Sequence, residues 1–290
     1  MSGASTTAVP LRKATGLRRI WQRHPNIVIG AMMFGSAVFA AIAAPWLGTV
    51  DPQAIAPFNR LEAPGADFWF GGDLIGRDVY SRTVYGARVS LAVGLGVAIG
   101  GISLGLIVGL FSGFVRWVDQ VLMRVMDGLM AIPSILLAVA LISLAGASLK
   151  NVIIAITIAE VPRVARLVRS VVLSLKEQPY VEAATTSGTS FLQILWRHIL
   201  PNTLAPLLVQ GTYIFASAVL TEAILSFIGA GTPPAIPSWG NIIAEGRTVF
   251  SIAPHIVLFP GLALSVTVLG VNLLGDGLRD RFDPRYVSRK

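Results

Sequence analysis

A serine between two glycines is the first pattern in this chain that could carry chemistry. Gly101, Ser103 and Gly105 match the Gly-x-Ser-x-Gly sequence of a nucleophile elbow, which would predict an intramembrane serine protease. Such an elbow needs a sharp turn from a strand into a helix, whereas this pentapeptide lies in the middle of an uninterrupted apolar stretch. The only candidate base at membrane depth, His255, lies near the outer end of another apolar stretch. We therefore expect Ser103→Ala to leave function intact.

Several other chemistries lack the residues that they need. The chain has no cysteine, which excludes a disulfide scaffold, a thiolate metal site and a cysteine nucleophile. Its three histidines are not clustered in the sequence, so we expect no histidine metal site. A P-loop needs Gly-Lys followed by Ser or Thr, and no lysine here follows a glycine. If ATP drives this protein, another chain must bind it.

Four carboxylates lie in or beside apolar stretches, where a charge is costly unless it faces a bundle interior or a water-filled cavity. We expect Asp127 and Asp276 to lie at the cytoplasmic ends of helices and to be structural. Glu160 and Glu222 lie deeper, and a helix-pairing role and a pathway role fit them equally well. A proton relay through either glutamate would suit a secondary transporter, but the inverted repeats of such transporters are not obvious here.

Three arginines recur at every third position, Arg163, Arg166 and Arg169. This spacing is also found in voltage-sensing helices. Arginines at the cytoplasmic end of a span are explained more simply as anchors under the positive-inside rule, so a channel is not favoured.

The composition explains why these charges stand out. The chain is 54% apolar and 13% charged, whereas about a quarter of the residues of an ordinary soluble domain are charged. A helix needs about 20 apolar residues to cross a bilayer. Uncharged stretches of this length occupy residues 26–50, 89–115, 128–149 and 201–221, and residues 248–275 carry only His255. A sixth stretch, 151–175, is interrupted by Glu160, Pro162 and Arg163.

The positions of Lys and Arg orient these six spans. Basic residues dominate the leading tail, the segment 163–200 and the end of the chain, which should therefore be cytoplasmic. Segments 51–88 and 230–247 fall outside, and the first of them mixes both signs of charge. The net charge of +8 then reflects cytoplasmic loops rather than binding of nucleic acid. The sequence thus predicts an all-α membrane protein with six transmembrane helices and both termini in the cytoplasm.

The first span also has the features of a cleavable signal peptide, because a basic region precedes an apolar stretch that ends in Ala41-Ile42-Ala43. The apolar stretch is longer than a signal peptide requires. Its removal would leave five spans, with the basic segments on the wrong side of the membrane. We expect it to be retained.

Glycine and proline indicate how the spans are shaped and packed. Glycines recur at every fourth position of the second span, at 101, 105, 109 and 113, and predict a ridge that lets another helix approach closely. A proline within the third, fourth and sixth spans should kink each helix. These prolines are Pro133, Pro162 and Pro260.

The cytoplasmic segment between the fourth and fifth spans predicts a short helix. Pro179 suits the first helical turn, Glu182 favours the positive N-terminal end and Gly188 is a natural stop. The small side chains of Ala183 and Ala184 give a surface that could lie deep in the groove of another protein. A plain connecting loop is the alternative.

The same segment resembles a family motif. Glu182-Ala183-Ala184, Gly188 and Leu200-Pro201 have the order and spacing of the EAA motif of ABC importer permeases. His198 stands where that motif commonly has isoleucine, and residues 197–202 are similar to the variant in dipeptide and oligopeptide permeases.

Two further stretches resemble the C-type permease subunit of peptide transporters. They are Phe70–Asp78 with Tyr85–Leu91, and Pro237–Asn241 with Glu245-Gly246-Arg247. Gly72 replaces a more common threonine. The resemblance covers about residues 25–285 and is more specific for the family than for the substrate.

The resemblance implies a type I (MetI-like) ABC importer permease fold in the bacterial cytoplasmic membrane. It implies four partners: a homologous permease, two ATP-binding subunits that hold ATP and Mg²⁺, and an external solute-binding protein. Glu182, Ala183, Ala184, Gly188, Leu200 and Pro201 would couple this chain to an ATPase. The expected parts are an N-terminal tail (1–25), a first span with an external segment (26–86), a transmembrane domain (87–277) containing the coupling loop (176–201), and a C-terminal tail (278–290).

The expected function is therefore half of a translocation pathway for di- or oligopeptides, without enzymatic activity of its own. Nickel, glutathione and oligosaccharide stay open as substrates of the same machinery. A proton-coupled secondary transporter is the alternative from a different class.

Overall fold

The computed structural model describes residues 25–282, so residues 1–24 of the predicted tail 1–25 and residues 283–290 of the predicted tail 278–290 lie outside the described residues. Within the described range the regular elements are helices, with one isolated bridge between Gly72 and Asp78. The helices are α2 (Pro25–Ala43), α3 (Val79–Phe114), α4 (Arg116–Met130), α5 (Ser134–Ala145), α6 (Leu149–Lys176), α7 (Pro179–Thr186), α8 (Phe191–Ile194), α9 (Leu200–Phe227), α10 (Trp239–Gly246) and α11 (His255–Phe282).

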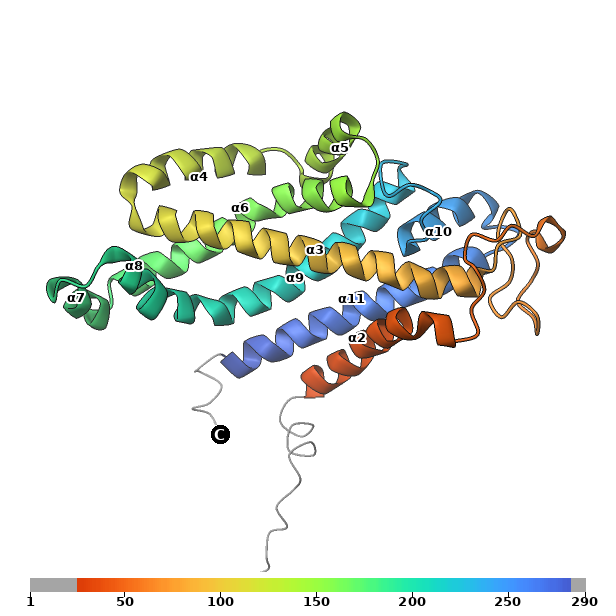
Figure 1. Ribbon diagram of the computed structural model, residues 1–290, viewed down its shortest axis with the longest axis horizontal. Coiled ribbons are helices and arrows are strands. Elements are labelled where there is room, and N and C mark those ends of the chain that lie inside the picture. The colour runs from red at the N-terminus through yellow and green to blue at the C-terminus, as the bar shows by residue number, and fades with distance from the viewer. Residues whose placement is uncertain (1–24, 283–290) are drawn as a thin grey trace, which may run out of the picture.

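The long helices α2, α3, α6, α9 and α11 lie along one another and form the body of the molecule (Figure 1). Short elements occupy its two ends. The end that carries α7 and α8 is called the α7 end, and the end that carries α10 and residues 47–78 is called the α10 end. Helices α7 and α10 lie at opposite ends because the 28-residue helix α9 runs between them in the chain.

Four helical segments are long and apolar enough to cross a membrane: Pro25–Trp46, Val79–Phe114, Phe191–Phe227 and His255–Phe282. Helices α4 and α5 together count as at most a fifth. The prediction of a helical membrane protein is confirmed. Helix α6 is as long as α9 and α11, with 28 residues, but its charged residues keep it out of a count based on apolar character.

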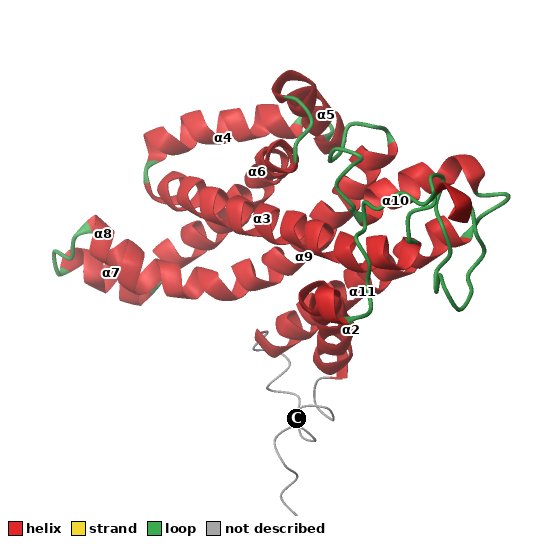
Figure 2. Cartoon of the chain, turned by 45° about the vertical axis from the view of Figure 1, so that its right-hand side comes forward, coloured by secondary structure: helices red, strands yellow, loops and turns green. Residues whose placement is uncertain are grey.

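The third predicted span, 128–149, differs from the structure. The chain does not merely kink at Pro133, because α4 ends at Met130 and α5 begins at Ser134, with 92° between them (Figure 2). Pro133 precedes the first residue of α5 and cannot donate a hydrogen bond, and it disfavours helical geometry in the residue before it. Helix α4 also has charged residues on one face, so its apolar content lies only on the other.

Three other boundaries differ. The second helix begins at Val79 rather than Val89, because the carboxylate of Asp78 accepts hydrogen bonds from the backbone of Tyr80 and Ser81 and starts the helix there. The last helix begins at His255, and residues 247–249 form a separate turn. The last helix also continues to Phe282, into the predicted C-terminal tail 278–290. Leu200 and Pro201, at the end of the predicted loop 176–201 and the start of the predicted span 201–221, begin α9, which follows α8 through one π-helical turn.

The glycine ridge of α3 is confirmed as a helix contact. A Cβ atom added to Gly109 would lie 2.6 Å from the carbonyl oxygen of Ala165, and one added to Gly113 would lie 2.6 Å from the side chain of Val172. Gly105 lies against Val164 in the same way. The ridge therefore brings α3 and α6 into backbone contact, as small residues do in membrane helices.

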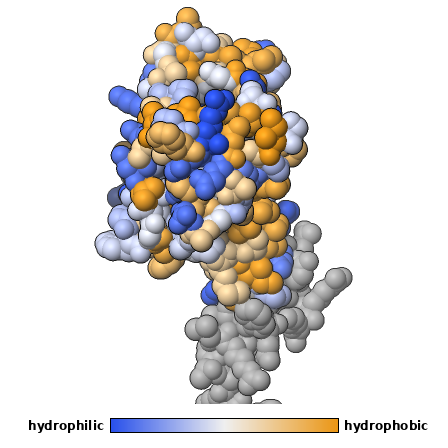
Figure 3. Space-filling model, turned by 90° about the vertical axis from the view of Figure 1, so that its right-hand side faces the viewer, coloured by the Kyte–Doolittle hydropathy of each residue, from blue (hydrophilic) through white to orange (hydrophobic). Residues whose placement is uncertain are grey.

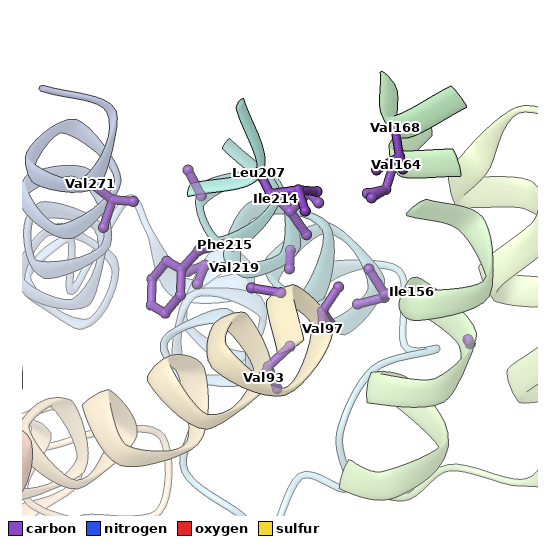
Figure 4. Packing of buried hydrophobic residues seen from close by; sticks show 14 of the residues in the cluster. Val93, Val97, Ile156, Val164, Val168, Leu207, Ile214, Phe215, Val219 and Val271 are labelled. Atoms are coloured by element: carbon purple, nitrogen blue, oxygen red, sulfur yellow. The ribbon is translucent and has the colours of Figure 1, made fainter. Parts of the chain in front are cut away.

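The main core lies among α3, α6, α9 and α11. Figure 4 shows Val93 and Val97 of α3, Val164 of α6, Phe215 of α9 and Val271 of α11 around the same interior. Ser103 is exposed in the middle of α3, so the Gly-x-Ser-x-Gly sequence forms no strand-to-helix turn. The structure thus excludes a nucleophile elbow.

Candidate functional site

Helix α7 has the capped geometry that its sequence predicts. Pro179 occupies the first turn, where its missing N–H costs no hydrogen bond, and Glu182 lies in the same turn. Gly188 follows the helix with a φ of +78°, and its N–H donates to the carbonyl of Thr185. The N–H of Thr189 donates to the carbonyl of Ala184, which completes a Schellman motif. The end of α7 is therefore fixed by backbone hydrogen bonds.

The six residues predicted to couple to a partner divide into two groups. Glu182, Ala183, Gly188 and Pro201 are exposed. Ala184 and Leu200 are half-buried and pack against the core. A Cβ atom at Gly188 would meet no atom within 4 Å, so the surface beside it is open.

Buried residues hold this surface in place. Val181 is 2% exposed and anchors α7, while Ile194 and Ile199 anchor the turns that lead into α9. The rings of Tyr180 and His198 lie 6.0 Å apart, which brings the start of α7 close to the start of α9. The α7 end therefore presents small exposed residues on a fixed support.

An ionic cluster of two acids and two arginines lies at the α10 end. The carboxylate of Asp73 accepts from Arg77 and from Arg82, each at 2.6 Å. Arg82 also donates to both oxygens of Glu245, at 2.6 and 3.1 Å, and Arg77 donates to Glu245 as well. The side chains of Arg82 and Asp73 are 1% exposed. The sequence did not reveal this cluster, because Glu245 lies far along the chain from the other three.

Trp239 fixes α10 against α3 beside this cluster. Its indole N–H donates to the carbonyl of Thr83 at 2.9 Å, and its backbone N–H donates to the hydroxyl of Ser90 at 3.2 Å. Gly86 provides the space, because a Cβ atom there would lie 3.3 Å from the indole ring. The two stretches 70–91 and 237–247 therefore meet in one structure, and hydrophilic and apolar residues are interleaved on the face at this end (Figure 3).

Glu222 is fully buried within the same end of α9. One of its oxygens accepts from the hydroxyls of Ser226 at 2.9 Å, Ser238 at 2.8 Å and Thr232 at 3.3 Å. The other oxygen has no partner within the described part of the chain and faces Gly240. These contacts join α9 to the segment that leads into α10, and they favour a helix-pairing role for Glu222.

Glu160 lies between α6 and α9. It accepts from Nη1 of Arg163 at 2.9 and 3.2 Å and from the hydroxyl of Ser217 at 3.4 Å. The guanidinium of Arg163 lies over the ring of Tyr213, 5.5 Å from its centre. Unlike Glu222, Glu160 is connected through Arg163 to a surface that the described chain leaves open.

The other two arginines of α6 pair with α4. Arg166 donates to Asp127, and Arg169 binds both oxygens of Asp119. These two ion pairs place Arg166 and Arg169 at the contact between α6 and α4 and give Asp127 a structural partner, whereas Arg163 pairs with Glu160 on its own helix.

A groove lies between α6, α9 and α11 towards the α7 end. It contains a cavity of about 490 Å³ lined by Leu167, Ala205, Pro206, Val209, Gln210, Arg279 and Phe282. A second cavity of about 210 Å³ shares Gln210 and Arg279 with it and reaches Tyr213 and Asp276. Among residues 25–282 no three histidine or acidic side chains are placed to hold a metal ion.

Comparisons of the sequence with known proteins identify a family. The family model of the "binding-protein-dependent transport system inner membrane component" matches residues 101–288. A "probable peptide ABC transporter permease protein" of Sinorhizobium fredii is 54% identical over 94% of this chain and 93% of its own length. The "dipeptide transport system permease protein" of Alkalihalophilus pseudofirmus is 44% identical over 92% of this chain and 88% of its own.

A solved structure shows the same fold. A chain of the MetNI methionine ABC transporter, in an inward-facing conformation, superposes with a TM-score of 0.57 over 70% of this chain and 97% of its own length. The two sequences are 22% identical, so this likeness concerns the fold alone.

Proposed function

The chain belongs to the family of binding-protein-dependent transport system inner membrane components, and from this premise we propose that it forms half of the translocation pathway of an ATP-driven peptide importer. It is the transport subunit of such a system and not its ATPase. We infer a peptide substrate from its relatives, since proteins 54% and 44% identical to it are named for peptide and dipeptide transport.

The proposed topology has six spans, with α6 and the α4–α5 pair counted. Each arginine in the middle of α6 has a carboxylate partner, which lowers the cost of burying its charge. The α7 end then lies in the cytoplasm and the α10 end outside. His255 at the start of α11 lies beside Gly71 at the α10 end, whereas Gly277 near the end of α11 lies against Ile27 near the start of α2. The described chain therefore begins and ends away from the α10 end, which suits cytoplasmic termini.

Helix α7 is the proposed contact with an ATPase, and its geometry is the observation that carries the proposal. Glu182, Ala183 and Gly188 are exposed on a short helix that buried Val181 anchors at the end of the bundle. Closure of the ATPases on ATP would move α7, and α6 and α9 on either side would transmit the movement to the pathway. Ala184 and Leu200, packed on the core, would carry the movement inward rather than touch the partner.

The proposed assembly contains this chain, a homologous permease, two ATPase subunits and an external solute-binding protein. ATP and Mg²⁺ would bind to the ATPases. Since no P-loop sequence occurs in this chain, the subunits that hydrolyse ATP are separate chains.

Uptake by the whole assembly tests the proposal. The complex is reconstituted in liposomes with ATP inside and loaded binding protein outside, and entry of a labelled tripeptide is measured. We expect uptake that requires both ATP and the binding protein, with glutathione, Ni²⁺ and an oligosaccharide as comparison substrates. Uptake by this chain without ATPases, driven by a proton gradient, would support a secondary transporter and contradict the proposal.

A further inference from the structure

Polar side chains of α9 and α11 line the groove between α6, α9 and α11. They are Gln210 and Tyr213 of α9 and Asp276 and Arg279 of α11, three positions apart on each helix and so on one face. Arg163 of α6 reaches this face, because its guanidinium lies over the ring of Tyr213, and it also lines a separate cavity of about 130 Å³ beside Pro133 and Ser134. In a chain this apolar, such a face is not suited to lipid tails and calls for protein or water beside it.

Arg163 is the cation that α6 places beside Tyr213 of this groove. It lies at the middle of the 28-residue helix α6, about 20 Å from either end at 1.5 Å per residue. Its side chain is 43% exposed, although half of the thickness of a bilayer would separate it from water on either side. A guanidinium exposed at this depth needs water, substrate or the partner permease beside it.

The guanidinium keeps part of its hydrogen-bonding capacity free. Only Nη1 donates to Glu160, and within residues 25–282 neither Nη2 nor Nε makes a hydrogen bond. Glu160 and the ring of Tyr213 hold the group in position. The free nitrogens form the planar fork that binds a carboxylate with two parallel hydrogen bonds.

We propose that Arg163 is a substrate contact that binds the C-terminal carboxylate of a peptide as it passes the middle of the membrane. This inference rests on the proposed peptide import. Every peptide carries that carboxylate whatever its side chains, so the contact suits a pathway for many sequences. The partial neutralisation of Arg163 by Glu160 keeps the contact weak enough for release, as conduction requires.

A purely structural role is the rival explanation, in which Arg163 only neutralises buried Glu160. Replacing both residues distinguishes the two. If neutralisation is the role of Arg163, Glu160→Gln with Arg163→Gln removes both charges and restores transport. If Arg163 binds substrate, the double variant imports as poorly as Arg163→Gln alone.

The experiment uses the reconstituted complex with trialanine and trialanine amide, each delivered on the binding protein. The preference of the binding protein cancels when each variant is compared with wild type for the same peptide. We expect Arg163→Gln and the double variant to lower import of trialanine by at least about tenfold and to change import of the amide by less than about twofold. Arg166→Gln is the control, since Arg166 is 46% exposed on the same helix but pairs with Asp127.

Restored import by the double variant, or an equal loss for both peptides, would overturn the inference. If the wild type does not import the amide, or a variant does not assemble, photocrosslinking decides. Benzoylphenylalanine at Tyr213 should capture labelled trialanine during turnover, and at Leu208, about 200° around α9 from Gln210, it should not. No capture at Tyr213 would overturn the inference. A wild-type complex that imports neither peptide would instead contradict the proposed function.

Discussion

Glu245 gives the sharpest test of how the α10 end is held together. In Glu245→Gln, Arg82 keeps Asp73 at 2.6 Å but loses the carboxylate that it binds at 2.6 and 3.1 Å, and Arg77 loses the same partner. The cluster holds two acids and two arginines, so the variant leaves one positive charge without compensation. Because Arg82 is 1% exposed, water cannot replace the lost partner there.

The expected cost follows from burial. Removing one member of a fully buried ion pair costs about 3–5 kcal/mol. The side chain of Glu245 is 21% exposed, so water near it offsets part of the loss. We therefore expect the free energy of unfolding to fall by about 2–3 kcal/mol, which is roughly a 30- to 140-fold change in the unfolding equilibrium.

Titration of the purified chain with a denaturing detergent, followed by tryptophan fluorescence, measures this loss. Glu62→Gln is the matched control, because Glu62 lies at the same α10 end, is exposed and makes no ion pair among the described residues. Arg77→Gln added to Glu245→Gln restores the charge balance and should recover part of the loss. The reasoning is refuted if Glu245→Gln and Glu62→Gln unfold within about 0.5 kcal/mol of each other.

Three further substitutions test other parts of the structure. Gly109→Leu should destabilise the chain by at least about 1–3 kcal/mol in the same titration, because α3 touches the backbone of α6 there, whereas Gly128→Ala, in open space, should not destabilise it. Ser103→Ala should leave peptide uptake unchanged, and a loss of uptake would show that the hydroxyl of Ser103 takes part in transport. Gly188→Trp should leave assembly intact but lower uptake and substrate-stimulated ATP hydrolysis by at least about tenfold, while Gly188→Asn, which tolerates positive φ, should retain more of both.

Local signals allowed the α7 segment to be predicted. Pro179, Glu182 and Gly188 each act within one or two helical turns, and the structure places them at the start, in the first turn and just beyond the end of α7. The glycine ridge of α3 was predictable for the same reason, because a period of four residues defines one side of a helix whatever packs against it.

The third span was harder to predict, because apolar composition alone does not distinguish one bent helix from two. The sequence predicted a kink at Pro133 within one helix, whereas the structure has two separate helices, α4 and α5, on either side of it. Asp119 and Asp127 make one face of α4 polar, and their partners lie on α6. Only the packing of α4 on α6 shows that these charges are paired.

The ionic cluster and the groove could not be predicted, because each joins residues far apart in the sequence. Arg77 and Arg82 meet Glu245 only after the long helices have folded back. In the sequence, Glu160 and Glu222 both lie deep in apolar stretches and fit the same two roles. In the structure, three hydroxyl groups donate to Glu222, while Glu160 pairs with an exposed arginine. The surroundings of the two glutamates depend on tertiary contacts that local sequence patterns do not predict.

The central claim is that α7 meets an ATPase on the cytoplasmic side, and labelling of an introduced cysteine tests it most directly. The chain contains no cysteine, so Ala183→Cys and, as a control at the α10 end, Phe58→Cys each add a unique thiol. The account predicts that a membrane-impermeant maleimide labels position 183 only in inside-out vesicles, that the assembled ATPases protect it, and that position 58 is labelled from outside with no such protection. Labelling of position 183 from outside, or equal labelling with and without the ATPases, would contradict the account.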